Sequence, residues 1–70
     1  LNPVMTIGEQ LTEALVKCNS FNKQELQEAL LSLLHEVEMP QPEVKIHQYP
    51  HQLSGGQKQR VVIAMALACK

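Results

Sequence analysis

Apolar and polar residues of this 70-residue chain alternate with helical spacing in its first part. Between Thr6 and Cys18, apolar side chains recur every three or four positions, while Glu9, Glu13 and Lys17 fall on the opposite face. The apolar positions are Ile7, Leu11, Ala14, Leu15 and Cys18. Thr6, followed three residues later by Glu9, forms the capping-box pattern of a helix start. The pattern therefore predicts an amphipathic helix over residues 6–18.

A second helical pattern follows after a short polar break. Asn22 and Glu25 repeat the cap spacing, and an apolar stripe with helical spacing continues through Val37. Its members are Leu26, Ala29, Leu30, Leu33, Leu34 and Val37. We predict a helix over residues 22–37 that packs antiparallel to the first, because the connection is short. Leucines at this spacing are typical of a core-facing stripe more than of a partner groove.

The third pattern begins with the pentapeptide Leu53-Ser54-Gly55-Gly56-Gln57 and ends in nine consecutive apolar residues, 61–69. Ser54 and Gln57 again have the spacing of a capping box, so we predict a helix over residues 54–69. The segment before it, 39–52, contains Pro40, Pro42 and Pro50 and is predicted to be irregular, with room for one helical turn near 43–47. The fold class predicted is all-α, with three helices.

Gly55 and Gly56 are unusual in the first turn of a helix. Each glycine costs a helix about 1 kcal/mol relative to alanine. One interpretation is a capped helix with a flexible entry. The other is an anion site, because a helix N-terminus has unpaired N–H groups and a partial positive charge that suit phosphate. Spacing alone leaves both interpretations open.

Composition excludes several functional classes. The formal net charge is −1 and the aromatic residues are Phe21 and Tyr49 alone, so neither a basic nucleic-acid footprint nor a base-stacking surface is expected. The longest apolar run is far shorter than the roughly 18 residues that span a bilayer. A chain of this size buries only about 60% of its unfolded surface, so a marginal core is expected.

Other candidate chemistry is weak. Cys18 and Cys69 are far apart in a chain with no secretory signal, which favours two free thiols over a disulfide. His47 and His51 are separated by Pro50 and cannot share a helix face, so no metal site is expected. The pair Ser54 and His51 has no orienting acid, so no catalytic residue is proposed.

Two basic residues follow the pentapeptide. Lys58 and Arg60 could add positive charge beside a bound anion. The alternative is an ordinary solvated helix face or a local ion pair, which we favour for Lys58.

The pentapeptide 53–57 resembles the signature motif of the ATP-binding cassette (ABC) transporter ATPases. The flanks are similar too: Tyr49-Pro50-His51-Gln52 precedes it, and Gln59-Arg60 and Ala64-Met65-Ala66-Leu67 follow it. Near the N-terminus, Leu1-Asn2-Pro3 and Thr6-Ile7-Gly8-Glu9-Gln10-Leu11 resemble the segment just after the Q-loop of that family. Both ends are most similar to the oligopeptide, dipeptide and nickel importer branch.

This resemblance implies that residues 1–70 form the helical subdomain of a nucleotide-binding domain, excised from a P-loop α/β ATPase. The Walker A and Walker B parts are absent, because the sequence has no Gly-Lys dipeptide and no aspartate. The chain alone is therefore not expected to be an ATPase, although the parent would be one. The start at Leu1 and the lack of a helix stop before Lys70 also suggest a piece of a larger domain, with exposed apolar surface where the remainder packs.

The resemblance also implies a binding site and partners. Ser54, Gly55 and Gly56 would bind the γ-phosphate of ATP held, with magnesium, by the opposite subunit, and Gln57 would lie near the phosphate or the ribose. A second nucleotide-binding domain and transmembrane permease subunits would be the partners, at the cytoplasmic face of the membrane. The transported solute and the permease-contact residues are not identified by the sequence.

A different class of function remains open. The chain could be a free-standing helical interaction module that binds a partner through the exposed face of its last helix. A DNA-binding helix-turn-helix is disfavoured, because the connection before the last helix is too long and the net charge is wrong.

Overall fold

Helices account for the regular structure of the chain. The structure is a computed structural model and describes residues 1–69. In chain order the elements are α1 (Ile7–Cys18), α2 (Lys23–Glu36), the short α3 (Pro42–Lys45), a 3-10 turn η1 (Pro50–Gln52) and α4 (Gly55–Leu67). The described residues form no strand. The all-α prediction is confirmed, the three long helices lie within two residues of their predicted bounds, and α3 is the predicted extra turn.

The three long helices begin in the same way, at a reciprocal side-chain cap. Glu9 N donates to Thr6 Oγ1 at 3.2 Å, and Thr6 N donates to Glu9 Oε1 at 2.8 Å. Asn22 and Glu25 form the same pair of bonds at the start of α2. At α4, Gln57 N donates to Ser54 Oγ at 3.1 Å. All three predicted capping boxes are confirmed, and each satisfies N–H groups that a helix start leaves free.

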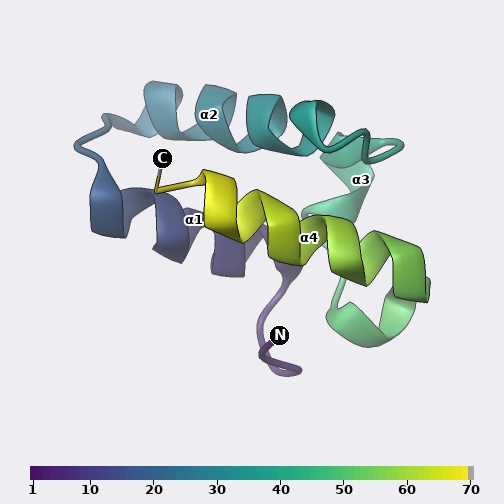
Figure 1. Ribbon diagram of the computed structural model, residues 1–70. Helices are drawn as coiled ribbons and strands as arrows, with labels where there is room; N and C mark the ends of the chain where they lie inside the picture. The colour runs from purple at the N-terminus through teal and green to yellow at the C-terminus, as the bar shows by residue number, and fades with distance from the viewer. Residues whose placement is uncertain (70) are drawn as a thin grey trace.

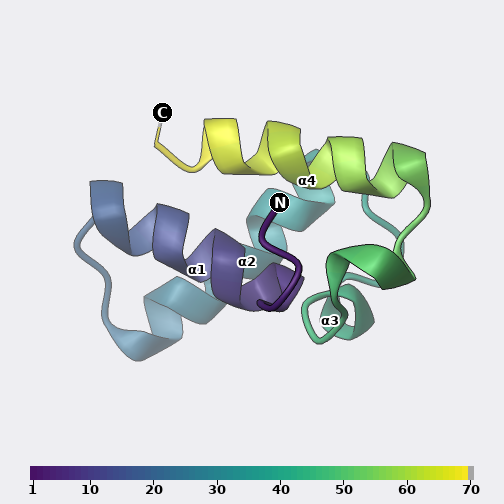
Figure 2. The same cartoon turned by 90° about the horizontal axis from the view of Figure 1, so that it is seen from below.

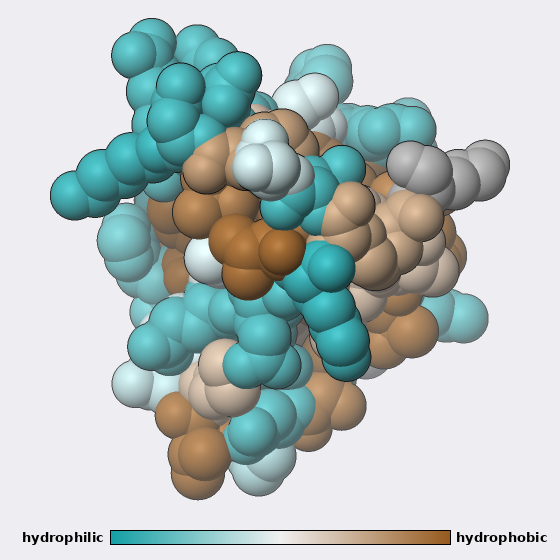
Figure 3. Space-filling view, turned by 90° about the vertical axis from the view of Figure 1, so that its left-hand side faces the viewer, coloured by the Kyte–Doolittle hydropathy of each residue, from teal (hydrophilic) through white to brown (hydrophobic). Residues whose placement is uncertain are grey.

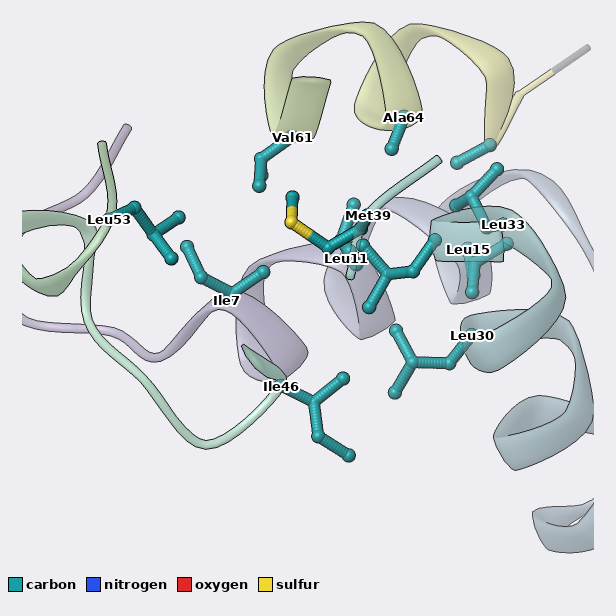
Figure 4. Packing of buried hydrophobic residues seen from close by; sticks show 12 residues of the cluster. Ile7, Leu11, Leu15, Leu30, Leu33, Met39, Ile46, Leu53, Val61 and Ala64 are labelled. Carbon is teal, nitrogen blue, oxygen red and sulfur yellow. The ribbon is translucent and has the colours of Figure 1, made fainter. Parts of the chain in front are cut away.

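One apolar cluster joins the helices, as Figure 4 shows. Its buried members come from every helix except α3 and from the connections: Ile7, Leu11, Leu15, Leu30, Leu33, Leu34, Met39, Ile46, Leu53, Val61, Ala64 and Ala68. Those from α1 and α2 belong to the predicted apolar faces. The side chains that α4 contributes are small, so α4 can lie close to its neighbours.

The helices are arranged around α1. In both Figure 1 and Figure 2, α4 lies alongside α1 and runs in the same direction, so the C-terminal ends of the two helices meet at one end of the molecule. Helix α2 runs in the opposite direction in Figure 1, as its short connection predicts, but crosses α1 in Figure 2. The N-terminal end of α4 therefore lies at the opposite end of the molecule from the C-terminal ends of α1 and α4.

The N-terminal end of α1 is closed by the chain itself. Ile7 N donates to Gln48 O at 2.8 Å, and Gly8 N donates to Ile46 O at 2.9 Å. A Cβ atom at Gly8 would lie 2.7 Å from the Ile46 carbonyl oxygen, so glycine is required for this approach. The first turn of α1 is therefore held against the segment 46–48.

A buried glutamine fixes the lead-in to α1. Gln10 is only 5% exposed. Its Oε1 accepts from Asn2 N at 3.0 Å, and its Nε2 donates to Asn2 O at 2.9 Å and to Met5 O at 3.0 Å. Because buried polar groups need partners, these bonds determine where residues 1–5 lie on the helix.

The two cysteines correct the prediction of free thiols. Cys18 and Cys69 form a disulfide, with their Cα atoms 5.3 Å apart and 51 positions apart in sequence. The prediction failed because it used sequence distance, whereas the parallel packing of α1 and α4 brings the ends of both helices together.

The predicted exposed apolar surface is present on the last helix. Val62 is 53% exposed and Ile63 is 49% exposed, whereas Val61 and Ala64 are buried. Helix α4 therefore buries one narrow face in this chain and leaves the rest of its apolar circumference uncovered. Along residues 1–69, every helix is too short or too polar to span a membrane.

Candidate functional site

The candidate site is the N-terminal end of α4. Ser54 is the cap residue with extended backbone, and Gly55 and Gly56 are the first two residues of the helix. Ser54, Gly55 and Gly56 are exposed, and Gln57 is half-buried. The structure thus places the four predicted site residues together on one accessible helix start.

Backbone donors at this end are free. Within residues 1–69, Gly55 N and Gly56 N donate no hydrogen bond, and the Gln57 N–H is used by the Ser54 cap. The corresponding amides of α1, Ile7 and Gly8, are occupied by carbonyl groups of segment 46–48. Two helix starts with the same cap therefore differ: the chain fills one of them and leaves the other open to a ligand.

Neither glycine of the site is required by the fold described. Neither has a positive φ, and a Cβ atom at either position would meet nothing within 4 Å among the described residues. Gly8 differs, because its contact with Ile46 excludes a side chain. Gly55 and Gly56 weaken the helix start by about 1 kcal/mol each, with no compensating contact to any of residues 1–69.

A shallow hollow of about 400 Å³ opens beside this helix end. It is lined by Glu38, Pro40, Ser54, Gly56, Gln57 and Arg60. Three of the four predicted site residues therefore line one concave surface. Its other wall is the connection between α2 and α3.

Arg60 holds that wall in place. Its Nη1 donates to Val37 O and to Glu38 O, both at 3.0 Å. The Glu38 carboxylate lies 3.8 Å from the same nitrogen, and this is the ion pair formed within the described part of the chain. Arg60 thus binds the two carbonyl groups that directly follow α2, at the helix end where the dipole favours a cation.

The connection itself has an unusual backbone. Glu38 has φ 60° and follows the last turn of α2, where Met39 N donates to Leu34 O. This is the position at which glycine usually ends a helix. The sequence reasoning missed both Glu38 and the cap by Arg60, because no glycine or asparagine marks the end of α2.

The remaining candidates lie outside this arrangement. Lys58 is exposed and forms no ion pair with the described residues, which fits the solvated-face interpretation. The His51 ring stacks on Tyr49 with centroids 6.0 Å apart. No group of three metal-ligating side chains occurs among residues 1–69.

Comparison with known proteins gives a consistent result. The ABC transporter family model matches residues 1–70. A dipeptide transport ATP-binding protein of Bacillus subtilis is 49% identical over 70 residues, which is 100% of this chain and 21% of that protein. An oligopeptide transport ATP-binding protein of the same organism is 48% identical over 68 residues, 97% of this chain and 19% of that protein.

A third relative, a dipeptide transport ATP-binding protein of Haemophilus influenzae, is 50% identical over 70 residues, which is 100% of this chain and 21% of the relative. The chain thus spans about one fifth of the length of these curated relatives. No solved structure matches it.

Proposed function

Since the chain belongs to the ABC transporter family, we propose that residues 1–70 form the helical subdomain of the ATP-binding subunit of a peptide importer. The names of the relatives support peptide transport and ATP binding. The Walker A and Walker B parts are absent from this sequence. The parent protein hydrolyses ATP, and this subdomain supplies only part of the site.

The N-terminal end of α4 is the phosphate-binding part of the subdomain. Ser54 Oγ and the free N–H groups of Gly55 and Gly56 bind the γ-phosphate of ATP, and Gln57 lies near the phosphate or the ribose. The donors and the positive end of the helix dipole suit an anion. The nucleotide and its magnesium are held by the opposite subunit, so ATP joins the two domains.

One observation carries this proposal: Gly55 and Gly56 lower helix stability, although neither the packing nor the backbone conformation of the described residues requires glycine there. Glycine at such a position is explained when an external group approaches the backbone closely. Gly8 is the contrasting case in the same molecule, because its close contact with Ile46 leaves no room for a side chain.

The partners follow from the same assignment. The second nucleotide-binding domain closes on the N-terminal end of α4, and this closure brings together catalytic groups that neither domain has alone. The subdomain transmits the closure to transmembrane permease subunits at the cytoplasmic face of the membrane. The exposed apolar face around Val62 and Ile63 packs against the remainder of the parent domain.

The test uses the full-length ATP-binding protein that contains this chain. Gly56→Asp puts a carboxylate where the phosphate would bind, so ATP-driven dimerisation should be lost. Gln24→Asp is the matched control, because Gln24 is the second residue of α2, is exposed and follows an equivalent cap. Both changes place an acid at a helix start and are compatible with folding.

Sedimentation velocity with and without ATP measures the dimer. We expect Gln24→Asp to dimerise as the unmodified protein does and Gly56→Asp to remain monomeric. Unchanged ATP-driven dimerisation of a folded Gly56→Asp protein would contradict the proposed site.

A further inference from the structure

The strongest unassigned chemistry is the bond between Cys18 and Cys69. Both residues are exposed, and neither belongs to the buried apolar cluster. The bond joins the last residue of α1 to a residue just beyond the end of α4. Figure 3 views this end of the molecule, where both hydrophilic and apolar areas reach the surface. An exposed disulfide is open to attack by a small thiol, and exposed bonds are the more easily reduced class.

Noncovalent contacts already hold the two cysteines together. Ala68, next to Cys69, is buried in the core, at 5% exposure. Asn19, next to Cys18, donates through Nδ2 to Leu15 O at 3.0 Å and to Ala68 O at 3.1 Å. These contacts bridge the ends of α1 and α4 independently of the sulfur atoms. They favour the same close approach of the two helix ends that the disulfide requires.

We propose that Cys18 and Cys69 are a reversible thiol–disulfide pair that peroxide oxidises and a glutathione-type thiol reduces, and that the oxidised form fastens the end of α4 to α1. This proposal concerns a second site, at the end of α4 opposite the phosphate-binding end. It does not depend on ATP binding.

The chemistry balances in both directions. One thiolate attacks hydrogen peroxide, the O–O bond breaks, and a sulfenic acid and one water form after protonation. The other thiolate attacks the sulfenic sulfur, so that the S–S bond forms, the S–O bond breaks and a second water leaves. In reduction, one glutathione thiolate opens the disulfide, and a second resolves the mixed disulfide to give oxidised glutathione and two protein thiols.

The first experiment measures the equilibrium with mixtures of reduced and oxidised glutathione. The 70-residue chain is acid-quenched and alkylated, and mass spectrometry then gives the fraction of intramolecular bond. We expect the equilibrium constant for bond formation to be on the order of 100-fold larger in native buffer than in concentrated guanidinium chloride, because the fold holds the two sulfurs together. Equal constants in the two solvents would overturn the proposal.

Asn19→Ala tests the source of this preorganisation. Without the amide bridge, the native equilibrium constant should fall by about tenfold, while the value in guanidinium stays unchanged. If the equilibrium constant for bond formation in native buffer did not change, the Asn19 hydrogen bonds would not be what positions the two cysteines. Cys18→Ser and Cys69→Ser serve as controls, and each should give only a mixed disulfide with glutathione.

Reversibility distinguishes a responsive pair from a permanent structural bond. Millimolar reduced glutathione should open the bond in the folded chain, and hydrogen peroxide should restore it. The oxidised chain should melt roughly 15 °C above the reduced chain. A bond that resists glutathione in native buffer, or two forms with the same melting temperature, would overturn the proposal.

Discussion

At the scale of single residues, the three glycines serve different purposes. Gly8 allows the first turn of α1 to contact the Ile46 carbonyl group, and a Cβ atom there would lie 2.7 Å from its oxygen. A Cβ atom at Gly55 or Gly56 meets nothing within 4 Å in the part of the chain that the structure describes. The same residue type is therefore a packing requirement in α1 and an opening to the outside in α4.

Alanine substitutions separate these two roles. Gly8→Ala should lower the free energy of unfolding by about 1–3 kcal/mol, because the backbone of segment 46–48 must move away. Gly55→Ala and Gly56→Ala should each raise it by about 1 kcal/mol, through helix propensity alone. Urea denaturation of the three variants measures these changes. If Gly56→Ala destabilised the chain as Gly8→Ala does, the fold itself would require the glycine.

Glu38 gives a second residue-level prediction. Its left-handed backbone costs a non-glycine residue about 1 kcal/mol or more, and the ion pair with Arg60 is exposed and long, at 3.8 Å. Glu38→Gly should therefore stabilise the chain by about 0.5–1 kcal/mol. The control Glu36→Gly places glycine inside the last turn of α2 and should destabilise. Thermal unfolding compares them, and destabilisation by Glu38→Gly would show that the ion pair outweighs the backbone cost.

At the scale of elements, the same capping box opens α1 and α4, which makes the two helix starts comparable. Removing the hydroxyl acceptor in either box leaves a helix N–H without its partner. Thr6→Ala and Ser54→Ala should each lower the free energy of unfolding by about 1 kcal/mol. In the full-length protein, only Ser54→Ala should also weaken ATP-driven dimerisation. If both changes weakened dimerisation equally, the effect of Ser54 would be one of stability alone.

The elements that the sequence predicted correctly are those whose signals are local. Helix caps and apolar spacing depend only on residues that are close in sequence. The three long helices could therefore be located in advance, from the caps at Thr6, Asn22 and Ser54 and from apolar residues that recur every three or four positions. The turn that follows α2 could not be predicted, because Glu38 adopts a left-handed backbone conformation and its carbonyl group accepts from Arg60, 22 residues later. The crossing of α1 and α2 likewise depends on how side chains from all the helices fill one core.

In the candidate site too, local features could be predicted from the sequence and long-range ones could not. The signature-like pentapeptide identified its residues because they are adjacent in sequence. The hollow beside it needs the connection after α2, which approaches only in the folded chain. The Cys18–Cys69 bond was missed for the same reason, since it depends on the parallel packing of α1 and α4.

At the scale of the whole molecule, the described residues form one core, and the glycine-lined start of α4 is exposed beside it. A single helix end contributes about 1–2 kcal/mol to phosphate binding, whereas even millimolar affinity requires about 4 kcal/mol. The 70-residue chain should therefore bind ATP too weakly for titration calorimetry to detect. Micromolar binding would contradict the assignment of this chain to half of a shared site.

Amide hydrogen exchange in the full-length protein tests the central claim most directly. Mass spectrometry would follow the peptide that contains Gly55, Gly56 and Gln57, with and without ATP under conditions that prevent hydrolysis. We predict that the free Gly55 and Gly56 amides become strongly protected in the ATP-bound dimer. In the nucleotide-free monomer only the Gln57 amide has a partner, the Ser54 cap, so protection of the peptide should be low, and the equivalent peptide at the start of α2 should not respond to ATP. An ATP-bound dimer in which the Gly55–Gln57 amides exchange as fast as in the monomer would contradict the account.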